Sequence, residues 1–218
     1  MKGLLIKDIR LMLGQKRFFL IVMGMGIMLM FSGDNPSASM GYVTMLITIF
    51  SLNTISYDEH ENGMSFLMTL PVTRKIYVQE KYVFAVTLAT VAGTFSVILA
   101  YVISTVRNIE VMLKELLIVA GALSSVSILI FAITLPLIIK FGSDKGRIAM
   151  FAVFSVIGVV IALLGKLAEN PNNPLMDMMV KLSEMSAGAI VFIAVFALIL
   201  MVLASYLVTI KIISKKEY

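Results

Sequence analysis

The chain has 218 residues, of which 60% are hydrophobic and 14% charged, and its formal net charge is +5. Soluble domains are about half apolar and about one-quarter charged, and a soluble fold of this length could not bury so much apolar surface. The absence of cysteine excludes disulfides, thiolate metal sites and cysteine nucleophiles. The composition therefore predicts an all-α integral membrane protein.

The first element, residues 1–17, is predicted to be an amphipathic helix along the inner membrane surface. Leu5, Ile9 and Leu13 recur at helical spacing, while cations occupy another side. Apolar side chains facing acyl chains and cations facing anionic headgroups are typical of interfacial helices. The alternative is a long first transmembrane helix that projects into the cytosol. Gly14 offers a bend before the apolar run and favours the interfacial helix.

Six apolar segments follow, and each predicts a transmembrane helix. A helix needs about 20 residues to cross about 30 Å of hydrocarbon, so the short first and fifth segments require snorkelling flanks or local bilayer thinning. Acidic, basic and histidine residues are absent from all six, which argues against a proton- or sodium-coupled transporter and against an intramembrane enzyme. The predicted spans are 18–31, 40–56, 82–106, 116–139, 148–164 and 188–210.

Basic residues predict the orientation, because cytoplasmic loops retain Lys and Arg. With the N-terminus inside, 14 of the 18 Lys and Arg residues fall on the inner side, and four fall outside. Both termini, including the tail 211–218, are therefore expected in the cytoplasm. The same asymmetry accounts for the positive net charge without a nucleic-acid partner.

The inner segment 57–81 carries the most information. An acidic start is followed by a glycine, a short apolar cluster and a proline that ends the predicted helix. An apolar face outside the membrane requires a partner, which is either the bilayer surface or a groove on another protein. These residues alone favour neither partner. Phe66, Leu67 and Leu70 make the apolar face, and the informative residues of the segment are Asp58, Glu59, Glu61, Gly63, Phe66, Leu67, Leu70, Pro71 and Arg74.

The order of motifs in this segment resembles ABC-2 type permeases. The motifs are Glu-Asn-Gly at 61–63, Leu-Pro-Val-Thr-Arg at 70–74, and then Tyr77 and Lys81. The likeness extends over the whole chain and is greatest to small bacterial permeases, including those that export phenol-soluble modulins and antimicrobial peptides. It implies a type V exporter-like permease fold, in which the nine residues above belong to a coupling helix that docks on an ABC ATPase subunit. It also implies a second permease copy, identical or paralogous.

Three further features are informative mainly for what they exclude. The inner turn 141–147 (FGSDKGR) lacks the spacing of a phosphate-binding loop, so ATP and Mg²⁺ are expected only in a partner ATPase. His60 is the only histidine and has no second ligand, so neither a metal site nor a catalytic or cofactor site is predicted. The outer segment 166–187 contains two prolines and predicts either a re-entrant helix or a helix lying on the outer leaflet.

Together these features predict the permease subunit of an ATP-driven exporter in the plasma membrane. The predicted path is largely apolar, which suits amphipathic peptides or other hydrophobic compounds. The alternative is a non-transporting membrane scaffold or sensor that binds a cytoplasmic partner through the same segment. The sequence does not choose between a homodimer and a heterodimer.

Overall fold

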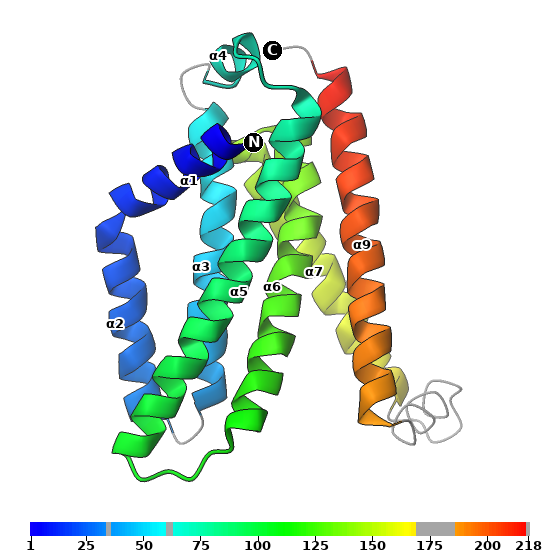
Figure 1. The fold of residues 1–218 in the computed structure, drawn as a ribbon. Coiled ribbons are helices and arrows are strands. Elements are labelled where there is room, and N and C mark those ends of the chain that lie inside the picture. Colours follow the sequence, from blue (N-terminus) through cyan, green and yellow to red (C-terminus); the bar gives the residue numbers. More distant parts are fainter. Residues whose placement is uncertain (34–35, 60–62, 169–185, 217–218) are drawn as a thin grey trace.

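The computed structural model describes the chain except for residues 34–35, 60–62, 169–185 and 217–218. The described residues form helices and no strand (Figure 1). The start of α1, the whole of α4 and the last turn of α9 lie at one end of the molecule, which we call the α4 end. The helices are α1 (Lys2–Gly14), α2 (Lys16–Ser32), α3 (Pro36–Glu59), α4 (Gly63–Thr69), α5 (Arg74–Val106), α6 (Leu113–Phe141), α7 (Ser143–Ala168) and α9 (Ala187–Lys215).

Six long helices contain the six predicted apolar segments and extend beyond them. Of the described helices, α3, α5, α6 and α9 are long and apolar enough to cross a membrane, and α1 with α2 make a fifth span if that bent pair counts as one. The two members of the pair meet at 66°. The largest difference in boundaries is at α5, which begins eight residues before the predicted span. Its N-terminus is capped by the Thr73 hydroxyl, which accepts a hydrogen bond from Ile76 N at 3.3 Å.

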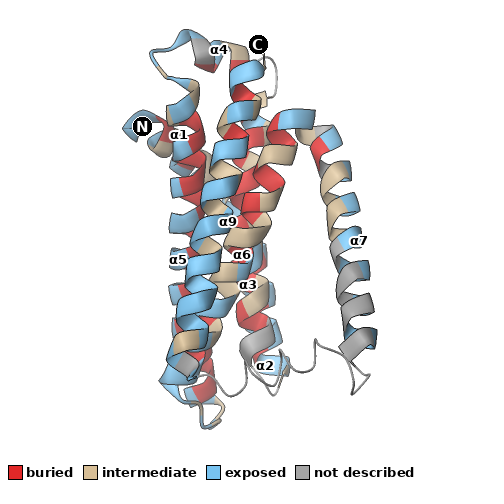
Figure 2. Cartoon of the chain, turned by 90° about the vertical axis from the view of Figure 1, so that its right-hand side faces the viewer, coloured by how far each residue is buried: buried red, intermediate tan, exposed pale blue. Residues whose placement is uncertain are grey.

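The exposure of α9 indicates that lipid, not water, surrounds the bundle. Among the four helices able to span a membrane, its apolar window has the highest mean hydropathy, yet 0% of that window is buried, against 56% for α3. Figure 2 shows α9 as a largely exposed helix on the outside of the bundle. A soluble protein buries its most apolar helix, whereas a bilayer solvates such a helix as well as a protein core does.

Two clusters of buried apolar side chains hold the bundle together. The larger one lies toward the α4 end, where α4 packs against α3, and the smaller one lies toward the opposite end. The larger cluster contains Leu4, Leu52, Ile55, Met64, Leu67, Tyr77, Val78, Tyr82, Ala85, Phe131, Ala132, Leu135, Ile138, Ile139 and Ile213. The smaller cluster contains Met30, Met40, Val97, Ala100, Ile103, Leu116 and Ala120.

Helix α3 packs on α5 through a row of buried hydroxyl side chains. Thr44 Oγ1 lies 3.3 Å from Ser96 Oγ of α5. Thr48, Ser51 and Thr54 continue the row, and each donates a hydrogen bond to a backbone carbonyl of its own helix, at 2.7, 2.6 and 2.8 Å. Small residues of this kind let two transmembrane helices approach closely while their polar groups stay satisfied.

A proline inside α6 creates a contact with α9. Pro136 has no N–H, so the carbonyl of Ala132, four residues earlier, loses its helical partner. The Ser205 hydroxyl of α9 donates a hydrogen bond to that carbonyl. Ser205 also shares a hydrogen bond of 2.6 Å with the Tyr82 hydroxyl, which lies 3.1 Å from Thr209 Oγ1. The Ala132 carbonyl, which the proline leaves without a helical donor, thus becomes part of a hydrogen-bond network that connects α5, α6 and α9.

Gly93 of α5 sits where α6 passes close by, and it supports a stability prediction. A Cβ at this position would lie 2.5 Å from Ser124 Oγ, whereas a Cβ at Gly121 of α6 would meet nothing within 4 Å. Gly93→Val should therefore lower the free energy of unfolding in mixed micelles by about 1–3 kcal/mol. Gly121→Val is the matched control and should change it by less than about 0.5 kcal/mol. Equal effects of the two substitutions would contradict the close packing of α5 on α6.

Candidate functional site

Three helices each bring one charged side chain to a single point at the α4 end. Lys81 of α5 is enclosed, with 1% of its surface exposed. Its Nζ lies 2.5 Å from Asp8 Oδ2 of α1 and 2.9 Å from Asp58 Oδ2 of α3. It also donates a hydrogen bond of 3.0 Å to Thr54 Oγ1. A buried ammonium is stable only when paired and hydrogen-bonded, and here both carboxylates come from other helices.

Two neighbours complete this charge cluster. Lys7 pairs with Asp58, and its Nζ lies 3.1 Å from Asp8 Oδ1. The Tyr77 hydroxyl donates a hydrogen bond of 3.1 Å to Asp58 Oδ2. Burial alone would raise the pKa of Asp8, but the charges of Lys81 and Lys7 outweigh burial and hold that pKa below its ordinary value. Asp8 therefore stays ionised and attaches α1 to the bundle.

A third carboxylate, Glu80, lies beside the cluster. It is fully buried, and neither of its oxygens has a hydrogen-bond partner among the described residues. Glu80 Oε2 lies 3.8 Å from Lys81 Nζ. The enclosed acids Asp8, Asp58 and Glu80 thus outnumber the two lysines, and removing a lysine would leave carboxylates buried without compensation.

Glu59, the residue after Asp58, holds a second set of contacts. Its Oε2 accepts hydrogen bonds of 2.6 Å from both the backbone N–H and the hydroxyl of Ser143, at the start of α7. Its Oε1 lies 3.8 Å from Lys216 Nζ, just after α9. Asp58 and Glu59 are the last two residues of α3, immediately before the loop to α4. They therefore connect α3 to α1 and α5, to the start of α7, and to the residue that follows α9.

Helix α4 has one face against the bundle and one face exposed. Met64 and Leu67 are buried in the larger apolar cluster. Phe66 is 67% exposed and Leu70 is 41% exposed, and Pro71 is exposed beside them. The helix ends at Thr69, close to the predicted stop at the proline. Its exposed side can therefore contact another molecule, while its buried side packs into the larger apolar cluster.

The nine predicted contact residues do not lie on one surface. Asp58 and Leu67 point into the bundle, and Glu59 is bound to Ser143. Arg74 Nη1 donates a hydrogen bond of 2.8 Å to the carbonyl of Ser214 in α9. A Cβ on Gly63 would lie 2.8 Å from the Asp58 carbonyl, so this position accepts only glycine without a backbone shift. Glu61 and His60 lie outside the described residues.

Sequence reasoning missed Asp8 and the buried placement of Lys81. The one available signal was the helical spacing of Asp8 with Leu4 and Leu11, which puts an acid among apolar residues in a segment that is otherwise basic. The six predicted spans contain no charge because the charged residues stand in the extensions of α3 and α5 beyond those spans.

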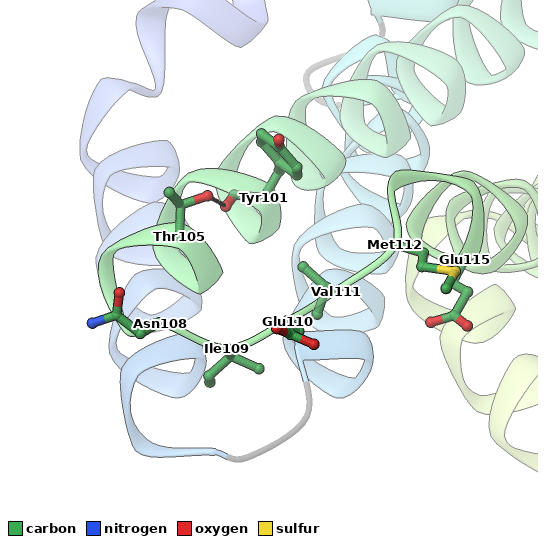
Figure 3. Close-up of a pocket in the computed structure, with 8 residues that line it drawn as sticks. All are labelled: Tyr101, Thr105, Asn108, Ile109, Glu110, Val111, Met112 and Glu115. Atoms are coloured by element: carbon green, nitrogen blue, oxygen red, sulfur yellow. Dashed lines mark hydrogen bonds between the residues drawn. The ribbon is translucent and has the colours of Figure 1, made fainter.

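A pocket of about 640 Å³ opens at the opposite end of the molecule, between α5 and α6 (Figure 3). It holds the carboxylates of Glu110 and Glu115 and the hydroxyls of Tyr101 and Thr105. Asn108, two residues after the end of α5, has a φ of 56°, the left-handed conformation that asparagine tolerates. Within the described ranges, no three His, Cys, Asp or Glu residues come together as a metal site. The charge cluster and the two-faced α4 are thus the features from which a function must be argued.

Residues 3–214, almost the whole chain, match the family model described as ABC-2 family transporter protein. The chain belongs to the ABC-2 transporter family. Neither a curated protein nor a solved structure matches it. Membership makes the chain a multi-pass membrane permease of an ABC transporter and implies, in general, an ABC ATPase as partner. The predicted resemblance is thereby confirmed at the level of the family.

Proposed function

We propose that this ABC-2 permease receives the motion of its ATPase through the exposed side of α4 and the residues that follow it. The observation that carries the proposal is the division of α4 into two faces. Phe66 and Leu70 are exposed apolar side chains of the kind that fill a groove on a partner. Met64 and Leu67, on the other face, are seated in the core.

Motion would travel from α4 to the spans by two physical routes. The first is the packed contact of Met64 and Leu67 with the larger apolar cluster, because a close-packed interior transmits displacement. The second is the acidic pair Asp58 and Glu59, whose bonds reach α1, α5 and α7. A rigid-body shift of helix ends is a common form of switching in transport assemblies. Under this proposal, Asp58, Glu59 and Arg74 position the docking surface and do not themselves contact the ATPase.

The topology, the second permease copy and the substrate class belong to the same proposal. The chain would form six spans with both termini in the cytoplasm, in a type V exporter-like arrangement with a second permease copy. ATP and Mg²⁺ would bind only to the ATPase subunits. The predicted spans contain no charged residue, so a path between two copies would be largely apolar. Such a path favours export of amphipathic peptides or other hydrophobic compounds. A non-transporting scaffold would use the same exposed α4 surface to bind a cytoplasmic partner. In that case binding would not change the rate at which the partner hydrolyses ATP.

The absence of cysteine provides a direct test of docking. Single-cysteine variants Phe66→Cys and Leu70→Cys, co-expressed with the ABC ATPases of the same cell, should cross-link to one of them through a short thiol-to-amine reagent. Leu207→Cys, which is also well exposed but lies on the apolar face of α9, is the matched control and should give no such product. Cross-linking from α9 alone, or from none of the three positions, would overturn the proposed contact.

A further inference from the structure

The bend between α1 and α2 contains an apolar groove that neither the family nor the coupling proposal explains. The groove has a volume of about 370 Å³, which is within the range of sites for a single small ligand. Five apolar side chains line it, and Lys16 is its one charged member. Its lining residues are Met12, Leu13, Lys16, Phe19, Leu20 and Met23.

A more polar hollow of about 600 Å³ shares the Lys16 side chain with this groove. It is lined by the turn at Gln15 and by Arg17. Both cations are exposed, and none of the ion pairs in the part of the chain that the structure describes involves either of them. Apolar and cationic surfaces therefore meet at one residue.

Lys16 and Arg17, the two cations at the bend, have no acidic residue near them in the sequence. Residues 1–33 contain five Lys and Arg residues and one acid, Asp8. That acid is buried and engaged by Lys81 and Lys7. The bend therefore presents positive charge beside an apolar groove, at the point where α1, predicted to lie along the membrane surface, turns into α2. This is the depth at which phospholipid headgroups lie above their acyl chains.

We infer that this bend binds one anionic phospholipid, with an acyl chain in the groove and the phosphate between Lys16 and Arg17. A bound lipid of this kind would hold the angle between α1 and α2. It would do so on α1, which Asp8 attaches to α5 and Lys7 attaches to α3. The site is independent of ATPase docking, since none of its residues belongs to α4.

The absence of tryptophan makes the site directly measurable. Leu20→Trp introduces a single fluorophore at a groove residue that is 71% exposed, so substitution should not disturb the core. The protein would be placed in phosphatidylcholine nanodiscs that contain a small fraction of brominated phosphatidylglycerol or brominated phosphatidylcholine. Quenching should reach half its maximum at a 10- to 30-fold lower mole fraction of the anionic lipid, because each cation adds roughly fivefold to anionic lipid affinity.

Two controls distinguish a specific lipid-binding site from general contact with lipid. Lys16→Gln with Arg17→Gln in the Leu20→Trp background should reduce the preference to about twofold or less. Lys2→Gln with Lys75→Gln, which removes the same charge from exposed positions elsewhere, should preserve it. A Leu203→Trp probe on α9 should show equal quenching by both lipids. Equal quenching of Leu20→Trp by the two brominated lipids would overturn the inference. An equal loss of preference in the two double variants would also overturn it, as would displacement of the anionic lipid by millimolar inorganic phosphate.

Discussion

Lys81→Met should destabilise the protein by about 3–5 kcal/mol, the range measured when one partner of a buried ion pair is removed. Methionine nearly matches the length and apolar stem of lysine, so the loss would come from charge and not from volume. Asp8 and Asp58 would remain enclosed, with only Lys7 to balance them. The free energy of unfolding in mixed micelles, followed by circular dichroism, measures the effect.

Lys75→Met is the matched control for that substitution. Lys75 lies six residues earlier on the same helix and is exposed, so its loss should change the free energy of unfolding by less than about 0.5 kcal/mol. If Lys81→Met does not yield folded protein, the combined variant with Asp8→Asn and Asp58→Asn should restore folding, because it removes the uncompensated charge. Failure of that rescue, or equal effects of the two lysine substitutions, would contradict the role of the cluster.

Phe66→Asp should reduce the affinity of the ATPase for the permease by at least about 30-fold, which corresponds to about 2 kcal/mol, the threshold of an interface hot spot. Phe66 is 67% exposed on α4, and a carboxylate in its place would enter an apolar groove without a partner. Because the side chain is outside the core, the free energy of unfolding should not change. Co-purification of the complex and its ATP turnover in nanodiscs measure the effect.

Two variants distinguish loss of this contact from added charge. Gln79→Asp introduces the same charge at an exposed position of α5 and should leave ATPase affinity within about twofold. Phe66→Tyr keeps the aromatic ring and should retain most of the affinity. Unchanged affinity and turnover in Phe66→Asp would argue against docking through α4 and would favour the scaffold.

Much of the bundle could be predicted from local sequence properties. Hydropathy located the apolar parts of α2, α3, α5, α6, α7 and α9, because the part of a helix that lies in lipid must be apolar. Among the described helices, α3, α5, α6 and α9 are long and apolar enough to cross a membrane by themselves. The separate α1 and the short helix before Pro71 were also predicted from charge and spacing. The start of α5 was placed eight residues late, because its first two turns carry the charges that form the cluster.

The contact of Asp8 with Lys81 could not be predicted in this way. The two residues are 73 positions apart, and neither pattern nor propensity specifies which of several acids a buried lysine will meet. The hydrogen bond from Ser205 to the Ala132 carbonyl could not be predicted for a related reason. Pro136 indicates a free carbonyl at Ala132, but only the packing of α9 on α6 identifies the donor.

The sequence by itself determined that the chain lies in a membrane, because its apolar residues occur in blocks that only lipid can solvate. It also carried the motif order that led to the ABC-2 family. Only the tertiary structure decided which side of α4 is free. In GMSFLMT the apolar residues Met64, Phe66 and Leu67 occur on more than one side, so periodicity shows no polar face. The core takes two of them and leaves Phe66 outside.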